Sequence, residues 1–375
     1  MACLCDKKPD SYVRLRGLNC TTTAIDRLYL PKNFAEDFNK FIFMGDRDTR
    51  IAPNGTGWRI SVPQQNNLTG IRKTATNSFP LGKSEWTITG DPECYEGKSY
   101  NLSLKLTSCK EDEFTCDDGL CIPMEERCDQ FGHCNDMSDE RDCQVLSLEE
   151  GYNKIIPPMT SVDGKKGPVK VILSLDILKI VDIDEEDNSI EIQLEITLKW
   201  TENRATYYNL KQDPVLNALT QKDISKLWLP EVIYENTDQK ESTRLGDGNW
   251  EWKTTVVIKK EGNFTRSGLE TVDEVEIFKG GENNLSMQQT YTHHFQCAFQ
   301  LTKYPFDTQV SQLCCCCISL LLFCSIERKC QHKIHFSDDN HLDVFLDLCD
   351  KNGYWLPGKQ LSQALSKQTV YDTRL

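Results

Sequence analysis

Residues 297–311 read Cys-Ala-Phe-Gln-Leu-Thr-Lys-Tyr-Pro-Phe-Asp-Thr-Gln-Val-Ser, and this stretch carries more information about the fold than any other in the chain. A cysteine opens it, an aromatic-Pro-Phe-Asp core follows, and a serine closes it. The members of this pattern are Cys297, Tyr304, Pro305, Phe306, Asp307 and Ser311. Directly beyond it, the consecutive cysteines 314–317 begin a segment of a different character.

This pattern resembles the signature loop of the Cys-loop family, the pentameric neurotransmitter-gated ion channels. In that family a second cysteine closes the loop, and this chain has Ser311 at its position. A disulfide that closes a loop of about 15 residues contributes about 3 kcal/mol in the chain-entropy model. The resemblance therefore predicts a loop that lacks this constraint, unless Cys314 or a neighbour substitutes.

Three further segments resemble motifs of the same family, in the same order along the chain. They are Gly151-Tyr152-Asn153-Lys154-x-x-Pro157, Trp200-Thr-Glu202-Asn-Arg204, and Leu227-Trp228-Leu229-Pro230-Glu231 with Asn236 beyond it. The resemblance makes Trp200 and Trp228 candidates for an agonist site at a subunit interface. A tryptophan at the end of a strand is also typical of a packed core, so both interpretations stay open.

Strict alternation of apolar and polar residues predicts strands in this part of the chain. Val169, Val171, Leu173, Leu175 and Ile177 share one face, and an acidic turn covers 182–188. The next run places Ile190, Ile192, Leu194, Ile196, Leu198 and Trp200 on one face, and 291–301 repeats the pattern. We interpret the first two runs as a half-buried antiparallel hairpin of a β-sandwich.

A cysteine framework precedes this domain. Its cysteines, 109, 116, 121, 128, 134 and 143, stand with Phe114, Gly119 and the run Asp136-Met-Ser-Asp-Glu140 at the spacing of an LDL-receptor class A repeat, which this segment resembles. The resemblance implies the disulfides Cys109–Cys121, Cys116–Cys134 and Cys128–Cys143. A module this small cannot bury enough apolar area by itself, so disulfides and a metal must stabilise it.

The same resemblance implies a calcium site. Its side-chain ligands would be Asp129, Asp139 and Glu140, with carbonyl groups from Glu126 and Phe131. His133 replaces the acidic residue that is usual at its position. Calcium prefers oxygen ligands, and imidazole is a poor substitute. We therefore expect a weakened calcium site, and a purely disulfide-held module is the alternative.

The N-terminal part, 19–108, alternates short apolar runs with turn residues and predicts a β-rich module. Cys20 and Cys94 are a possible staple for it. Trp58 and Trp86 are predicted to be core residues, with carbohydrate stacking as the alternative.

The composition indicates an oxidising compartment. The chain has 375 residues, 18 cysteines and a net charge of -14, which argue for more than one domain, for secretion, and against a nucleic-acid partner. Asn-x-Ser/Thr sequons predict glycosylation at Asn19, Asn54, Asn67, Asn101, Asn263 and Asn284. The start shows no readable signal peptide, and the apolar run 313–324 is shorter than the roughly 20 residues of a membrane-spanning helix. We expect the natural N-terminus to lie further upstream.

The prediction is a mainly β protein that contains a truncated antiparallel β-sandwich. We divide it into an unassigned leader (1–18), a β-rich module (19–108), an LDL-receptor class A repeat (109–143), an incomplete Cys-loop receptor ligand-binding domain (144–311) and an unpatterned tail (312–375). Because the family resemblance ends at Val310, the tail is predicted to lie outside the family fold. Translated intron is one explanation, and a genuine C-terminus is the other.

The function that the resemblance implies is the extracellular ligand-binding part of a neurotransmitter-gated channel subunit, at the plasma membrane in a full-length form. Its partners would be homologous subunits of a pentamer and a small-molecule agonist. We expect no enzymatic activity, since no nucleophile elbow, phosphate loop or zinc-protease spacing occurs. A secreted binding or decoy protein and a lectin-like adhesion protein are the alternatives.

Overall fold

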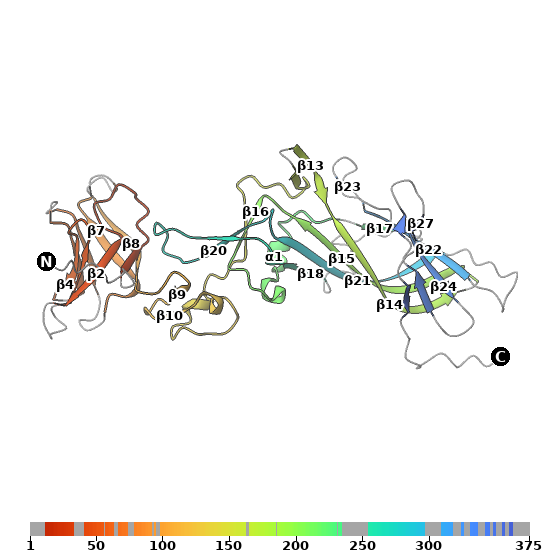
Figure 1. Cartoon of the computed structure of the whole chain (residues 1–375), viewed down its shortest axis with the longest axis horizontal. Coiled ribbons are helices and arrows are strands. Elements are labelled where there is room, and N and C mark those ends of the chain that lie inside the picture. Colours follow the sequence, from red (N-terminus) through yellow and green to blue (C-terminus); the bar gives the residue numbers. More distant parts are fainter. Residues whose placement is uncertain are drawn as a thin grey trace, which may run out of the picture. The chain divides into compact units, whose positions relative to one another are not determined.

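The computed structural model describes residues 12–33, 41–55, 57–63, 67–73, 79–91, 94, 98–162, 165–184, 186–230, 232–234 and 254–296, and in the tail only short strands. The chain divides into two compact units. The first comprises Met1–Ser147, Tyr207–Gln212 and Gly262–Phe278, and the second comprises Leu148–Thr206, Asp213–Glu261 and Lys279–Leu375. Strands dominate both, which confirms the prediction of a mainly β protein (Figure 1).

The first unit contains a closed barrel in which strands follow one another in chain order. The strands are β1 (Val13–Arg16), β2 (Leu28–Asn33), β3 (Phe41–Gly45), β4 (Arg50–Pro53), β5 (Gly57–Ser61), β6 (Thr69–Lys73), β7 (Gly82–Thr89) and β8 (Ser99–Thr107). β1 pairs antiparallel with both β2 and β8, which closes the sheet. Because β1 precedes residue 19, the barrel begins earlier in the chain than the predicted boundary of the module. In the sequence, the sign of this first strand is the short alternation of Val13 and Leu15, which are both buried.

Alternate residues of the barrel strands point inward and form one core. On β7, Trp86 and Ile88 are buried, while Glu85, Thr87 and Thr89 are exposed. Trp58 and Trp86 both belong to this core, as predicted. The disulfide Cys20–Cys94 joins the beginning of the barrel to the segment that precedes β8.

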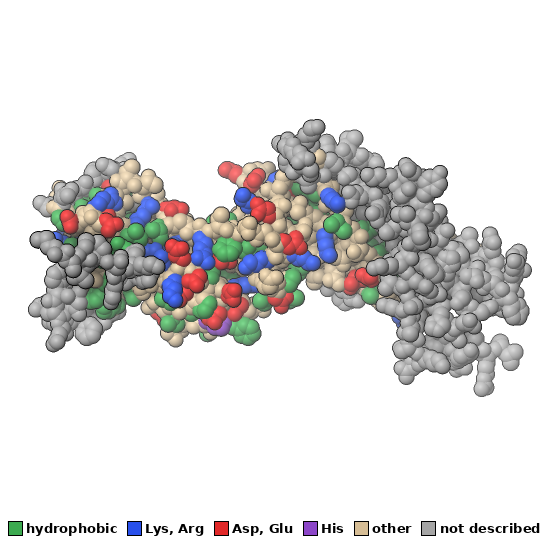
Figure 2. Space-filling model, in the orientation of Figure 1, with side chains coloured by type: hydrophobic (Ala, Val, Ile, Leu, Met, Phe, Trp, Pro, Cys, Tyr) green, Lys and Arg blue, Asp and Glu red, His purple; other side chains and the backbone are tan. Residues whose placement is uncertain are grey.

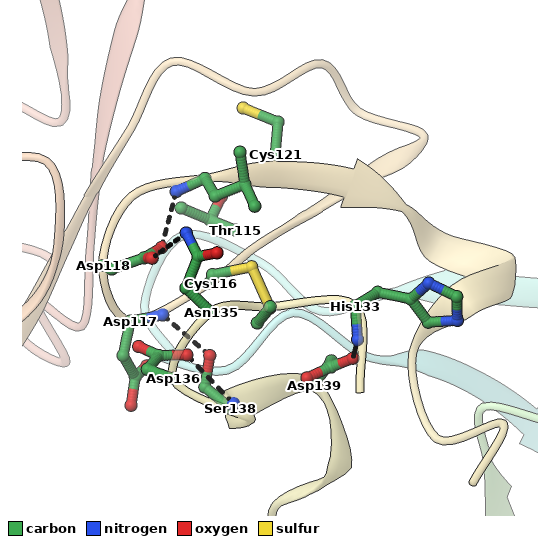
Figure 3. The surroundings of a disulfide bond; sticks show 12 residues. Thr115, Cys116, Asp117, Asp118, Cys121, His133, Asn135, Asp136, Ser138 and Asp139 are labelled. Carbon is green, nitrogen blue, oxygen red and sulfur yellow. Dashed lines mark hydrogen bonds between the residues drawn. A yellow bond between two sulfur atoms is a disulfide. The ribbon is translucent and has the colours of Figure 1, made fainter. Parts of the chain in front are cut away.

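The cysteine module follows the barrel. It contains β9 (Glu113–Thr115), β10 (Cys121–Pro123) and the 3-10 turns η2 (Met124–Glu126) and η3 (Ser138–Glu140). Phe114, Cys116, Ile122, Met124 and Cys134 form its small core. Its disulfides are Cys109–Cys121, Cys116–Cys134 and Cys128–Cys143, the pairs that the resemblance implies. Figure 3 shows the surroundings of the disulfide that Cys116 forms.

A loop from a distant part of the sequence completes the first unit. It connects β19 (Phe264–Arg266) to β20 (Glu276–Lys279), and these two strands pair antiparallel. Their sheet has the order β11-β16-β20-β19, where β11 is Leu146–Leu148 and β16 is Ala205–Tyr208. Arg16 Nη2 donates to Ser267 Oγ at 2.9 Å and to the Gly268 carbonyl at 2.8 Å. Lys105 Nζ lies 3.8 Å from Glu274 Oε2.

The second unit contains a sheet of the order β14-β15-β21-β18. Its strands are β14 (Ile172–Asp184), β15 (Ser189–Thr201), β21 (Asn284–Gln296) and β18 (Thr255–Ile258). On β15, Ile190, Ile192, Leu194, Ile196, Leu198 and Trp200 are buried, so the predicted face and hairpin are confirmed. β14 is the edge strand, with irregular register after Ile177, and it begins at Ile172 rather than at Val169, which belongs to β13 (Lys165–Lys170).

Shorter elements and the tail complete this unit. They are β12 (Met159–Val162), η4 (Pro214–Asn217), α1 (Gln221–Ile224), β17 (Val232–Tyr234), β22 (Gln309–Cys317), β23 (Cys324–Ser325), β24 (Gln331–Phe336), β25 (Leu342–Phe345), β26 (Leu348–Cys349), β27 (Trp355–Leu356) and β28 (Gln360–Ser362). A second sheet has the order β17-β22-β24-β25-β28. The tail therefore has strands where the sequence pattern predicts no regular structure, because backbone pairing does not require alternating side chains.

Candidate functional sites

The predicted calcium ligands gather around the loop 126–133 of the cysteine module. His133 Nε2 lies 3.1 Å from Asp129 Oδ2, and its Nδ1 lies 3.6 Å from Glu126 Oε2. The imidazole of His133 therefore faces two carboxylates at once. Phe131, whose carbonyl is a predicted ligand, donates its backbone N–H to Asp129 Oδ1 at 2.9 Å.

The other two acidic residues hold the backbone of the same loop. Glu140 accepts from the N–H groups of Asp129 at 2.9 Å and Gln130 at 3.1 Å. Asp139 is fully buried, and its Oδ2 accepts from the His133 N–H at 2.6 Å (Figure 3). Its other oxygen, Oδ1, is buried and has no hydrogen-bond partner in the part of the chain that the structure describes.

This donor set fits a hard cation in part. A buried carboxylate oxygen without a partner is costly and suits a bound cation. Asp129 and Glu140 bring further carboxylates to the same loop, but both oxygens of Glu140 already accept backbone N–H groups. His133 does not fit, because a nitrogen ligand replaces an oxygen and a charge is lost. When bound, calcium would stabilise the loop by neutralising these carboxylates. The potential metal-ligand atoms of Cys109, Glu113 and Cys121 also lie within 4.8 Å of one another. They do not form a metal site, because both sulfurs belong to one disulfide and cannot serve as thiolate ligands.

Replacing His133 by aspartate is expected to raise the calcium affinity of the chain about tenfold or more, because the change adds one charge and one oxygen ligand. Calorimetric titration of the oxidised chain with calcium measures the difference. Glu125→Gln is the matched control, since this neighbouring carboxylate is exposed. Equal affinities of wild type and His133→Asp would refute the ligand assignment.

A second cluster joins the three receptor-like motifs inside the second unit. Glu202 is fully buried near the end of β15. Its Oε1 accepts from Arg204 Nε at 2.8 Å, and its Oε2 accepts from Arg204 Nη2 at 2.7 Å. Tyr152 donates its hydroxyl to Glu202 Oε2 at 2.9 Å, and the same hydroxyl accepts from the Trp228 N–H at 2.8 Å. We call Tyr152, Glu202, Arg204 and Trp228 the motif cluster.

The electrostatics of the motif cluster are balanced. Burial raises the pKa of Tyr152, so its hydroxyl stays protonated and can donate to Glu202. Burial works against the charge of Arg204, but the hydrogen bonds to Glu202 outweigh it and raise the pKa of Arg204. The Arg204 guanidinium also lies over the Tyr152 ring, 4.4 Å from its centroid. Each charged group of the cluster therefore has its partner within it.

Trp200 and Trp228 meet edge to face, with ring centroids 6.3 Å apart. Their exposed fractions are only 1% and 4%. Both rings pack in the interior of the unit, as the core interpretation expects. A role of either ring in agonist binding stays a prediction.

Several predicted residues lie elsewhere. Cys297, Tyr304, Pro305, Phe306 and Asp307 lie outside the described residues. The backbone of Ser311 is part of β22, opposite Ile334. Of the predicted glycan acceptors, Asn19, Asn54, Asn67, Asn101 and Asn263 are exposed, whereas Asn284 is half-buried and donates to Glu261.

Sequence reasoning missed the residues that connect the motifs. Tyr152 belongs to one of the motifs that resemble the family, but nothing in its local sequence indicates that its hydroxyl bridges Glu202 and Trp228. The sequence around Asp273 and Glu274 does not indicate a buried role, because an acidic pair in a turn is usually a solvated surface feature. Among the described residues, no helix is long and apolar enough to cross a membrane.

Two parts of the chain match known protein families. Residues 143–319 match the neurotransmitter-gated ion-channel ligand binding domain, and residues 107–143 match the low-density lipoprotein receptor domain class A. The chain thus carries a ligand-binding domain of the neurotransmitter-gated ion-channel family, preceded by an LDL-receptor class A domain. The first match continues beyond 311, where the sequence pattern predicts the domain to end.

Individual relatives are distant. The acetylcholine receptor subunit beta-type unc-29 of Caenorhabditis elegans is 26% identical over 132 residues, which are 34% of this chain and 24% of the relative. The gamma-aminobutyric acid receptor subunit pi of Rattus norvegicus is 23% identical over 167 residues, 44% of this chain and 30% of the relative. The vitellogenin receptor of Solenopsis invicta is 49% identical over 49 residues, 13% of this chain and 3% of the relative. The chain thus spans less than a third of each relative.

Proposed function

We propose that this chain is the extracellular ligand-binding part of a neurotransmitter-gated ion-channel subunit that assembles with homologous subunits into a pentamer. The observation that carries the proposal is the motif cluster. Tyr152, Glu202 and Trp228 come from three separated motifs, and their side chains and backbone join in one buried network. Such agreement between sequence order and spatial contact supports a common fold rather than chance similarity.

The ligand proposed is a small neurotransmitter of the kind named for the relatives, acetylcholine or gamma-aminobutyric acid. It would bind at an interface between subunits, so a single chain carries only part of the site. The LDL-receptor class A repeat would act as an extracellular binding module, with calcium as its structural ion. An enzymatic role has no support from any of these features.

The test is expression of the complete coding sequence, obtained from transcripts, in oocytes under voltage clamp. Acetylcholine and gamma-aminobutyric acid are applied separately, and we expect an agonist-evoked current from one of them. Uninjected oocytes and a form ending at Leu375 are the controls. The channel proposal would be wrong if all transcripts ended at the codon for Leu375 and the secreted protein bound transmitter without producing a current. That result would support the alternative, a secreted binding protein.

A further inference from the structure

The interior of the β1–β8 barrel contains a buried cation that has no counter-ion among the described residues. Arg72 lies on β6 and is only 8% exposed. It pairs across the sheet with Trp58 of β5, which belongs to the barrel core. Its neighbours in sequence alternate as expected, since Gly70 is buried and Ile71 is exposed. The Arg72 side chain therefore starts from the inner face of the barrel.

Arg72 differs from the other strongly buried cations of the first unit. Arg16 donates to Ser267 and Gly268, Lys105 lies beside Glu274, and Arg127 lies over the Phe114 ring with Asp273 and Glu274 acting on its charge. Among the described residues, Nε and Nη1 of Arg72 have no hydrogen-bond partner, and the same is true of Nε and Nη1 of Arg127. Arg127 has acidic groups acting on its charge, so the lack of a counter-ion is what distinguishes Arg72. Burial alone lowers the pKa of Arg72, with no acidic group acting against it.

Two residues on the neighbouring strand β7 also have buried polar atoms without hydrogen bonds among the described residues. Ile71 pairs with Thr87, so Arg72 and Trp86 are cross-strand neighbours on the inner face. Within the described ranges, Trp86 Nε1 is buried without a hydrogen bond, and so is Oγ of Ser84, two residues along the same face. An indole and a guanidinium can only donate, and a hydroxyl can also donate. The site thus offers several donors and one positive charge, and among the described residues no carboxylate acts on that charge.

Unpaired buried donors of this kind call for an occupant, because native proteins satisfy nearly all buried polar groups. The occupant must bring acceptor atoms and a negative charge. Aromatic rings next to Arg72 add a second requirement: Trp58 lies 5.9 Å from Phe43 and 6.0 Å from Phe79, measured between ring centroids. Phe79 is 41% exposed, so this aromatic group reaches the surface.

We propose that the barrel binds a small carboxylic acid with an apolar body, its carboxylate at Arg72, Ser84 and Trp86 and its body against Phe43, Trp58 and Phe79. The interior of an eight-stranded barrel is either filled by its own side chains or holds one small ligand among them. The charge-assisted hydrogen bonds from Arg72 provide the affinity, and the aromatic rings select against free inorganic anions. This binding is independent of the proposed channel function.

Phenylacetate is the probe, and phenylacetamide is its neutral counterpart. We expect calorimetry on the full chain to detect saturable binding of phenylacetate and at least about tenfold weaker binding of the amide, because the charge is lost. Arg72→Met is expected to weaken phenylacetate binding roughly 10- to 100-fold. The same change is expected to raise the melting temperature of the ligand-free chain, because an uncompensated buried charge is replaced by an apolar side chain.

Arg59→Met is the matched control, since Arg59 lies on β5 next to Trp58 and is exposed; it is expected to change neither quantity. The opposing effects of Arg72→Met on binding and on stability distinguish a ligand-binding arginine from a structural one. The proposal is overturned if phenylacetate does not bind to the wild type or if the amide binds equally well. It is also overturned if Arg72→Met lowers the melting temperature while binding persists.

Discussion

Replacing Glu202 by glutamine is expected to lower the free energy of unfolding of the second unit by about 3 kcal/mol, because breaking a buried ion pair leaves the remaining charge without compensation. Glu202 is fully buried and accepts from both Arg204 and Tyr152. A glutamine of the same shape keeps one acceptor but places an amide group against the Arg204 guanidinium. Urea unfolding followed by tryptophan fluorescence measures the loss.

Hydrogen exchange gives a local measurement of the same change. The Trp228 N–H donates to Tyr152, whose hydroxyl donates to Glu202. We therefore expect this amide to exchange faster in Glu202→Gln. Glu150→Gln is the control, because Glu150 is exposed in the segment next to Tyr152. A loss below about 1 kcal/mol, the value of an exposed ion pair, would show that the motif cluster does not stabilise the unit.

The second large effect is expected at Glu274. Glu274→Gln should destabilise the first unit by about 3 kcal/mol, because Lys105, only 1% exposed, loses its nearest carboxylate. Glu274 also accepts from the Thr115 N–H at 2.8 Å and from the Thr115 hydroxyl at 3.1 Å. Thermal unfolding of the oxidised chain measures the loss.

The double variant Lys105→Met with Glu274→Gln should recover part of the stability, since Lys105 no longer leaves an uncompensated buried charge. Recovery is incomplete because Arg127, on whose charge Glu274 also acts, stays buried. The pH dependence has a defined sign. Burial lowers the pKa of Lys105 although Glu274 and Asp117 oppose it, so the unfolded state binds more protons and stability rises with pH toward the ordinary lysine pKa. The deficit of Glu274→Gln should therefore shrink as the pH rises. A deficit that is constant with pH and persists in the double variant would contradict this account.

The sequence predicts what depends on local pattern. Alternation identifies the buried face of β15 from Ile190 to Trp200, and cysteine spacing indicates the class A module. What it does not predict depends on residues that are far apart in the chain. Nothing near Glu274 indicates that its carboxylate meets Lys105, and nothing near Tyr152 indicates a bond to Glu202. The predicted calcium site is intermediate. Its ligands are close in sequence and can be predicted, but how well they suit calcium depends on one unusual residue, His133.

The barrel shows a further limit of pattern reading. Its strands are short and separated by turns, so alternation predicts β structure but neither closure nor the first strand. Arg72 follows the inward period of β6, yet a single arginine in a strand is ordinarily assigned to the solvent face. That Arg72 is buried without a counter-ion among the described residues can be recognised only from the structure, in which β5 and β7 lie on either side of β6.

The loop between β19 and β20 also bears on how the protein is made. Arg16 and its acceptor Ser267 are separated by 251 positions. At the usual speed of synthesis, about 5–20 residues per second, roughly 12–50 s pass between the appearance of the two on the ribosome. During this interval the nascent barrel and cysteine module hold Arg16, Lys105 and Arg127 before Asp273 and Glu274 exist. The early modules are therefore expected to remain loosely packed on the ribosome and to reach their final state only when the later loop arrives.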